Sequence, residues 1–456
     1  MKITLQYTKF FFLFIIISFL WNCDKNELSN DNENTTKEKL PLIKINTFGE
    51  AIVDEPKIDA YLTIEEQEVT TYEGGIGIEF RGASSQSFPK KSYGLETRDE
   101  NNDDLSVSLL DFPEEEDWIL YGPYSDKSLI RNRLIYDLSN EMNRYASRCK
   151  FVELTINNQY QGLYVFMEKL KRDKNRIDIN KLNEDENTGE DVTGGYILKI
   201  DKTAGNNLGD GYNNLNSFRS QYPPNHATSG QQIHFLYEYP KAEDITTEQK
   251  QYISTYISEF ENKLASAEFA DPVNGYTTYI DVDSFIDFFI LNELSNNVDG
   301  YRLSTFMFKD KNDKLNMGPI WDFNLAFGNA NYCGGGNTNV WAYKFNERCS
   351  DDFWQVPFWW ERLLEDPNFV SKLKTRWNEL STGILSEAAI ISKIDSYKNT
   401  LTDSEAITHN FTKWNVLGIY VWPNNYIGNT YEEELNYLKG WIHNRHNWLH
   451  NAINSL

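Results

Sequence analysis

One continuous segment, residues 281–328, constrains the fold of this 456-residue chain more than any other. Asp281 is a suitable N-cap, and Asn296-Asn297 is a suitable helix end. Between them apolar side chains recur at helical spacing, among them Val282, Phe285, Phe288 and Phe289. The pattern predicts one helix over this stretch.

The same segment continues as a predicted hairpin. Residues 301–309 and 315–321 have the composition of strands, and the four residues between 309 and 314 have that of a turn. Asp299 lies just after the helix, and Asp322 directly follows the second strand. Because an antiparallel strand returns to the end where its partner began, we expect these two carboxylates at one end of the hairpin.

Two carboxylates that converge at strand ends suit phosphoryl transfer. One can orient the attacking hydroxyl, while the other holds the magnesium ions that neutralise phosphate charge. The order helix, Asp, hairpin, Asp-Phe is also that of the protein-kinase catalytic segment. The alternative is that Asp299 caps a turn and Asp322 only ends a strand, since aspartate is common in turns.

Two strings here, NVDGY at 297–301 and PIWDFNLAFG at 319–328, resemble the paired signatures of the CotH (spore coat protein H) kinase family. FRGASS at 80–85 and PKKSY at 89–93 resemble its N-terminal signature. Shorter similar strings follow in order at 117–120, 128–132, 162–168 and 194–198. The resemblance implies an α+β, atypical protein-kinase-like fold with a mixed or antiparallel sheet and a mainly helical C-terminal part.

The resemblance also implies an activity: magnesium-dependent transfer of the γ-phosphate of ATP to a Ser or Thr hydroxyl of a protein substrate. ATP and Mg²⁺ would be the cofactors. Asp299 would be the catalytic base or orienting residue, and Asp322 would bind magnesium, with Asn324 as a further metal ligand.

A kinase also needs a cation beside the nucleotide phosphates. Lys91 of the PKKSY string is our candidate, and Lys90 is its rival by strand alternation. Arg131, on the helix predicted over 128–142, is a second candidate for nucleotide binding. It has an alternative role as an ion-pair partner of Asp126 or Asp137.

Glu168 is the third candidate for nucleotide binding, because it closes a hydrophobic strand and resembles the family's strand-end acid. The chain departs from the protein-kinase pattern at Ser304, where an Asn is usual as second metal ligand. Gly74, Gly75 and Gly77 lack the spacing of a glycine-rich phosphate loop and predict a tight turn. Because Ser304 replaces the usual second metal ligand, the sequence does not predict the number of metal ions.

Composition agrees with a substantial folded enzyme. The chain is 40% hydrophobic and contains 12 Trp, 27 Tyr and 27 Phe, which favours a large core over disorder. Its formal net charge of −24 argues against a nucleic-acid partner or an anionic membrane surface, both of which need clustered cations. A local pocket can still bind ATP.

The N-terminus predicts export. Lys2 and Lys9 precede an apolar run over 10–20, and Cys23 follows it as in a bacterial lipoprotein signal. We therefore predict a signal peptide over 1–22, a flexible tether over 23–40, a CotH kinase-like domain over 41–456, and lipidation of Cys23. The protein would be anchored in the membrane by lipid, in the cell envelope; a plain cleaved signal or a retained anchor are the alternatives.

The other cysteines fit an oxidising compartment. Cys333 and Cys349 bracket a loop rich in Gly and Asn, and a disulfide between them would order it. Zinc is the competing interpretation, but the loop has no CxxC pair and no nearby histidine. Cys149 would be a buried free thiol.

Further elements are predicted from periodicity. Strands are expected over 41–45 and 76–80, a hairpin over 151–167, helices over 248–264, 366–380 and 430–449, and a long polar loop over 205–230. Three histidines, His443, His446 and His450, share one face of the last helix, but we expect no metal there because no carboxylate or cysteine shares their spacing.

Two rival functions belong to other classes. The chain could be a non-catalytic surface lipoprotein that binds glycan or protein partners through its many aromatic side chains. A glycoside hydrolase would also use two carboxylates, but a hairpin-paired aspartate couple fits that chemistry poorly.

Overall fold

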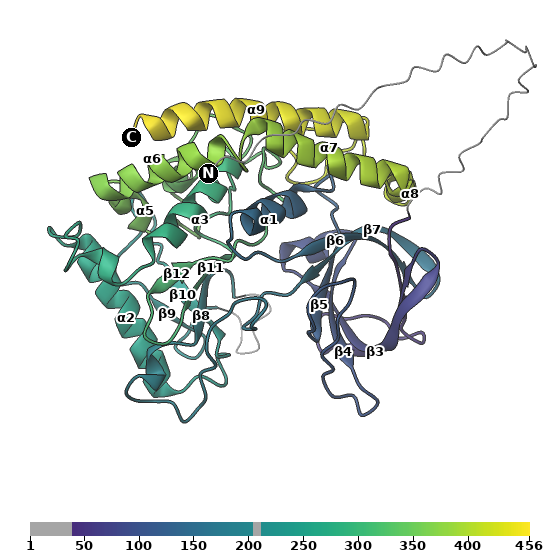
Figure 1. Ribbon diagram of the computed structural model, residues 1–456, viewed down its shortest axis with the longest axis horizontal. Coiled ribbons are helices and arrows are strands. Elements are labelled where there is room, and N and C mark those ends of the chain that lie inside the picture. The colour runs from purple at the N-terminus through teal and green to yellow at the C-terminus, as the bar shows by residue number, and fades with distance from the viewer. Residues whose placement is uncertain (1–38, 204–210) are drawn as a thin grey trace, which may run out of the picture. The chain divides into compact units, whose positions relative to one another are not determined.

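The computed structural model describes residues 39–203 and 211–456. This part of the chain contains a closed β-barrel, a separate antiparallel sheet and a set of helices (Figure 1). The predicted α+β class with a mixed sheet and a mainly helical C-terminal part is what the structure has. The predicted signal peptide, Cys23 and most of the predicted tether lie outside the described residues.

The barrel closes because its first and sixth strands pair in parallel, whereas its other neighbouring strands are antiparallel. Its strands run in the order β1 (Leu42–Asn46), β2 (Ile58–Glu66), β3 (Val69–Arg81), β4 (Ser92–Arg98), β5 (Asp117–Tyr121), β7 (Gln159–Glu168) and β6 (Cys149–Ile156). Alternate residues such as Ile43, Ile45, Leu62 and Ile64 fill its interior. The hairpin predicted over 151–167 is β6–β7.

The three glycines predicted as a tight turn lie inside strand β3 instead. At Gly77, a Cβ atom would come within 2.6 Å of the guanidinium of Arg98 on the neighbouring strand. Glycine here therefore makes room for a cross-strand arginine, and the turn prediction is wrong.

The second sheet holds the predicted catalytic hairpin. Its order is β12 (Leu315–Met317), β11 (Thr305–Lys309), β8 (Tyr196–Ile200), β10 (His234–Tyr239) and β9 (Ser217–Arg219), with all pairs antiparallel. Strand β9 interrupts the long loop predicted over 205–230. The hairpin strands are shorter than predicted, because residues 301–304 form turns and bends and residues 318–323 have no regular structure.

Helices make up most of the chain after residue 340. The helices of the described chain are α1 (Arg131–Glu141), α2 (Thr247–Ala265), α3 (Val282–Ser295), α4 (Phe345–Arg348), α5 (Trp359–Leu363), α6 (Pro367–Ser381), α7 (Glu387–Asp403), α8 (Ala406–Lys413) and α9 (Tyr431–Asn454). Short 3₁₀ turns are η1 (Ser84–Ser87), η2 (Asp191–Thr193), η3 (Tyr276–Thr278) and η4 (Ala342–Lys344). Helices α6 and α9 pack on each other and on α3 (Figure 1). No helix among the described residues has both the length and the apolarity to cross a bilayer.

Helix α3 is the central element, and its predicted caps are present. The Asp281 side chain accepts a hydrogen bond from the Ser284 N–H at 2.6 Å, and Asn296 ends the helix in a left-handed conformation. Near its end the fully buried Glu293 forms an ion pair with Arg445 of α9 at 3.2 Å. The helix end from which the Asp299 loop departs is therefore fixed to the C-terminal helix.

Candidate active site

Asp299 lies in the loop that leaves helix α3, where two side chains hold its carboxylate. Arg302 Nη2 donates to Asp299 Oδ1 at 2.6 Å, and the Tyr332 hydroxyl donates to the same oxygen at 3.2 Å. Arg302 is itself buried, donates to the Val298 carbonyl and to Asp352 Oδ1, and lies over the Phe345 ring. The carboxylate is therefore oriented, with about a fifth of its side chain open to solvent (19%).

Asp322 is held through its backbone by helix α1. Its N–H donates to the Tyr136 hydroxyl at 2.9 Å, and the N–H of Phe323 donates to Asn132 Oδ1 at 2.8 Å. Trp321 stacks on the Tyr136 ring. Asp322 has a left-handed backbone, with φ of 61°, and lies five residues beyond the end of strand β12 rather than directly after it as predicted.

The Asp322 carboxyl has an unusual electrostatic environment. Burial, the charge of Asp299 and the charge of a third aspartate, Asp201, raise its pKa to about 7, although Lys202 and Arg81 oppose the shift. Asp201 directly follows strand β8, and the backbone N–H groups of Lys202 and Ser304 donate to it. Burial also raises the pKa of Asp201. Three carboxylates therefore share one region.

Arg81 and Lys202 are the cations of this region. Arg81 ends strand β3 of the barrel and lies over the Trp321 ring at 5.5 Å. Lys202 donates to Ser84 Oγ at 3.4 Å and lies over the Trp354 ring at 5.0 Å. Within residues 39–203 and 211–456, neither forms an ion pair within 4.0 Å, although Glu238, Glu79, Asp117 and Asp322 act on Arg81 electrostatically.

Three carboxylates and two cations without an ion-pair partner among the described residues come together here. They are contributed by the end of strand β3, the residues after strand β8, the loop after helix α3 and the residues after strand β12. The family model for CotH kinase protein matches residues 78–449, which include every one of these side chains. The chain belongs to the CotH kinase protein family. No curated protein matches the chain closely enough to count as a relative.

The other residues predicted for nucleotide binding in this CotH family chain have structural partners. Lys91 donates to the Gln86 carbonyl beside η1, and its rival Lys90 is buried, where it donates to the Leu163 carbonyl at 2.6 Å. Burial holds the pKa of Lys90 well below its usual value. No contact in the described residues joins either lysine to Asp322.

Arg131 and Glu168 also belong to buried networks. Arg131 pairs with Asp126 at 2.5 Å, one of its two predicted alternatives, and donates to the carbonyl of Ala326, so it fixes the segment after Asp322. Glu168 accepts from Arg148 Nη2 at 2.6 Å. Both side chains are fully buried, with 1% exposure or less, and the role predicted for them remains a prediction.

Asn324, the metal ligand predicted beside Asp322, has a side chain that is available for a ligand. Asn324 lies in the turn after Asp322, and in the described part of the chain its side chain makes no hydrogen bond, whereas its carbonyl accepts from Asn329 at 2.8 Å. Ser304 offers its backbone N–H to Asp201. Sequence reasoning missed Asp201, Lys202 and Arg81, although Asp201 and Lys202 follow one of the strings that resemble the family, at 194–198, and Arg81 lies within another, at 80–85.

The structure joins Cys333 and Cys349 in a disulfide with a Cα–Cα distance of 5.8 Å. Arg348 Nε donates to the Cys333 carbonyl at 3.0 Å, so the bracket is also closed by a hydrogen bond. Cys149 is a buried free thiol, and burial raises its pKa. The disulfide lies next to Tyr332, which contacts Asp299.

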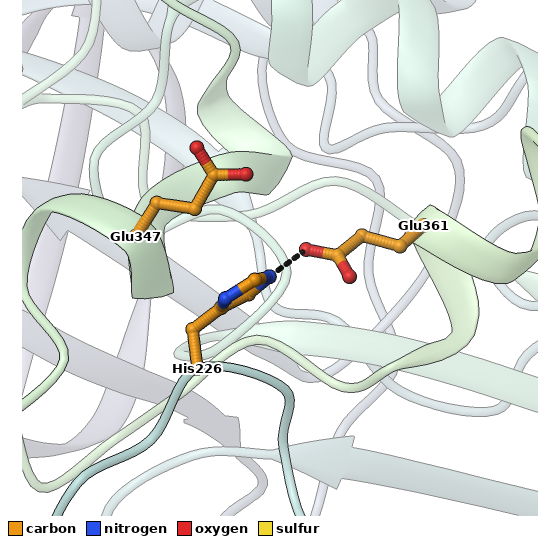
Figure 2. A group of neighbouring side chains, drawn as sticks. All are labelled: His226, Glu347 and Glu361. Carbon is orange, nitrogen blue, oxygen red and sulfur yellow. Dashed lines mark ion pairs between the residues drawn. The ribbon is translucent and has the colours of Figure 1, made fainter.

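Two other groups in the described chain place three possible metal ligands within 4.8 Å of one another. Glu115, Glu116 and Asp117 form one, but Lys171 pairs with all three. His226, Glu347 and Glu361 form the other, shown in Figure 2. There His226 already pairs with Glu361 at 3.1 Å and Glu347 with a lysine at 2.9 Å. Neither group includes the three histidines of α9.

Proposed function

We propose that this protein is an atypical kinase that transfers the γ-phosphate of ATP to a Ser or Thr hydroxyl of a protein, in a magnesium-dependent reaction. Membership of the CotH kinase family supports phosphoryl transfer. The observation that carries the proposal is the position of Asp322, a half-buried aspartate with a left-handed backbone, in the electrostatic field of the cations Arg81 and Lys202. A kinase-like arrangement of the barrel and the hairpin sheet is part of the same proposal.

The residues present fit a magnesium-nucleotide complex. Carboxylates are the ligands that Mg²⁺ prefers, and the raised pKa of Asp322 shows a carboxyl whose negative charge lacks compensation. Asp322 would hold the metal, and Asp201 and the free side chain of Asn324 are its possible co-ligands. Bound Mg²⁺ would neutralise charge on the phosphate oxygens.

The two unpaired cations would hold the phosphates. Arg81 and Lys202 come from the barrel and from the second sheet, so they approach the site from two elements. We favour them over Lys91 and Arg131, because both of those already donate to carbonyl groups or carboxylates of the fold. Ser84 Oγ, which contacts Lys202, brings the barrel loop 82–91 to the same place.

Asp299 would act on the acceptor hydroxyl. Arg302 and Tyr332 fix one carboxylate oxygen, which leaves Asp299 Oδ2 free to accept the proton of an incoming hydroxyl. The acceptor oxygen attacks the γ-phosphorus, the bond from that phosphorus to the β–γ bridging oxygen breaks so that ADP leaves, and the hydroxyl proton moves to Asp299. Positioning and charge compensation supply most of the acceleration in such reactions.

Nucleotide-dependent thermal stabilisation tests the assignment of the cations. We expect ATP with Mg²⁺ to raise the Tm of the wild type, and Arg81→Met and Lys202→Met each to lower the affinity about tenfold or more, because each removes a charged phosphate contact. Lys91→Met is the matched control and should bind as the wild type does. If Lys91→Met is the only variant that loses stabilisation, the original sequence prediction is right and our assignment is wrong.

The rival function is a non-catalytic surface lipoprotein that binds glycan or protein partners. It requires no nucleotide, so a wild-type Tm that ignores ATP and Mg²⁺ but rises with an oligosaccharide or a protein partner would favour it. Export and lipid anchoring in the cell envelope are compatible with either function.

A further inference from the structure

An aromatic surface, partly buried at Tyr332 and exposed at its other members, borders the candidate catalytic aspartate. It consists of Tyr332, Tyr420 and Trp422, and we call it the aromatic surface. The Tyr332 hydroxyl donates to Asp299 Oδ1 at 3.2 Å, and the Tyr332 ring lies parallel to that of Trp422 with centroids 6.2 Å apart. Trp422 is 54% and Tyr420 49% exposed. The surface therefore runs from the Asp299 carboxylate out to solvent.

Hydrogen bonds from neighbouring asparagines hold the aromatic surface in place. Asn331 Nδ2 donates to the Tyr420 hydroxyl at 3.0 Å, and the Asn331 N–H donates to the Pro423 carbonyl at 2.9 Å. Asn424 Nδ2 ties the loop to the Ser125 carbonyl at 2.7 Å. The disulfide of Cys333 fixes the residue next to Tyr332. A surface ordered before binding loses little entropy when a partner arrives.

The chemistry of the surface selects a class of partner. Exposed Trp and Tyr side chains are typical anchors of protein–protein contacts. Ile419, which is 50% exposed and adjoins Tyr420 in sequence, adds an aliphatic side chain that packs on an apolar peptide side chain but offers a sugar neither an aromatic ring for stacking nor a hydrogen bond. The nearby carboxylates Asp299 and Asp322 disfavour an acidic peptide.

We propose that the aromatic surface docks the acceptor, and that the acceptor is an extended polypeptide segment with a large apolar side chain close to its Ser or Thr hydroxyl. This inference rests on the proposed kinase function. The apolar side chain lies on Trp422 and Tyr420, which places the neighbouring hydroxyl at Asp299. Acidic residues beside the hydroxyl are disfavoured.

Peptide binding measured without nucleotide tests whether the aromatic surface docks the acceptor. Fluorescent peptides with a central Ser, flanked by apolar, basic or acidic residues, are titrated by anisotropy against wild type, Trp422→Ala and Phe48→Ala. Phe48 is 71% exposed on the barrel and is the matched control. We expect apolar-flanked peptides to bind best, Trp422→Ala to weaken them about tenfold or more, and Phe48→Ala to leave them unchanged.

Three results would overturn the proposal: no peptide binds, Trp422→Ala binds as the wild type does, or only oligosaccharides added as competitors bind. The Tm of each variant controls for folding. Failure of the kinase function is distinguishable, because it appears as absent ATP-dependent stabilisation whether or not peptides bind.

Phosphate transfer tests the link to the reaction. With the best-bound peptide and radiolabelled ATP, Trp422→Ala should raise the KM for the peptide about tenfold and change kcat and ATP binding much less, since Trp422 stacks on Tyr332 but contacts neither Asp299 nor the cations of the site. Tyr332→Phe keeps the ring but loses the hydrogen bond to Asp299, so it should lower kcat instead. Unchanged KM for the peptide in Trp422→Ala would contradict acceptor docking here.

Discussion

The Asp322 carboxyl is the residue whose environment says most about the site. Burial, Asp299 and Asp201 raise its pKa to about 7, above the ordinary value of 3.8. Because its pKa in the folded protein lies above that in the unfolded chain, the folded state binds this proton more tightly. The contribution of this carboxyl to stability is therefore greatest below about pH 4 and is lost as the pH rises through about 7.

Asp322→Asn removes this pH-dependent contribution. We expect the variant without ligand to be more stable than the wild type at pH 8, by on the order of 1–2 kcal/mol in the free energy of unfolding, and the difference to shrink towards pH 5. Urea denaturation at the two pH values measures it, with the exposed Asp351→Asn as control. A variant less stable than the wild type at pH 8 would show that the carboxylate makes a favourable native contact instead.

At the scale of elements, the bracket formed by Cys333 and Cys349 connects Tyr332 to helix α4. The residues that flank the disulfide on both sides contact the Asp299 region. Tyr332, just before Cys333, donates to Asp299, and Asp352, three residues after Cys349, pairs with Arg302 at 3.2 Å. A closed loop with a sequence separation of 16 residues restricts the unfolded chain appreciably.

Removing the bracket should destabilise the protein. We expect the double substitution Cys333→Ser with Cys349→Ser to lower the free energy of unfolding by about 3 kcal/mol. Guanidinium denaturation with and without reductant measures it, and reductant should act on the wild type but not on the double variant. Peptide mapping under non-reducing conditions that recovered two free thiols from exported wild type would contradict the disulfide.

Local elements of this fold follow from local signals, whereas the site depends on tertiary contacts. Helix α3 was predictable because both of its caps are written in the sequence, at Asp281 and Asn296. The predicted hairpin strands were longer than the strands in the structure, because positive φ angles at Ser304 and Gly318 turn the backbone out of the extended conformation. A positive φ is common for glycine, but at Ser304 it is imposed by the surrounding packing, which the sequence does not reveal.

The cations of the site could not be predicted for the same reason. Strand alternation ranked Lys90 against Lys91, but it cannot show that Lys90 enters the core or that Arg81 ends over Trp321. Arg81, Lys202 and Asp322 are far apart in sequence and meet only because the barrel, strand β8 and the hairpin converge. The proximity of Asp322 to Asp299 was predictable, since the hairpin carries Asp322 back to the end where Asp299 lies.

For the whole molecule, strong overall acidity coexists with local positive charge. The net charge of −24 does not prevent anion binding, because Arg81 and Lys202 have no ion-pair partners in the described residues. The N-terminal residues predict where the whole molecule resides: Cys23 follows an apolar run in a segment outside the described residues.

Lipidation can be tested on the full chain in an exporting host. Metabolic labelling with a clickable fatty acid should mark the wild type, and Cys23→Ala should abolish the label because it removes the thiol that carries the lipid. Cys149→Ala, which alters a thiol buried in the folded domain, is the control and should keep the label. Labelling that survives Cys23→Ala would refute lipidation at this position.

The central claim is that Asp299 and Asp322 act on phosphate transfer in different ways. The most direct measurement compares magnesium-dependent transfer of radiolabelled γ-phosphate to a panel of secreted proteins, with ATP-dependent Tm shifts as the companion control. We expect Asp322→Asn to lose both transfer and ATP stabilisation, and Asp299→Asn to keep stabilisation while transfer falls at least about 100-fold. If both variants label acceptors as well as the wild type does, the two aspartates are structural and the kinase account is contradicted.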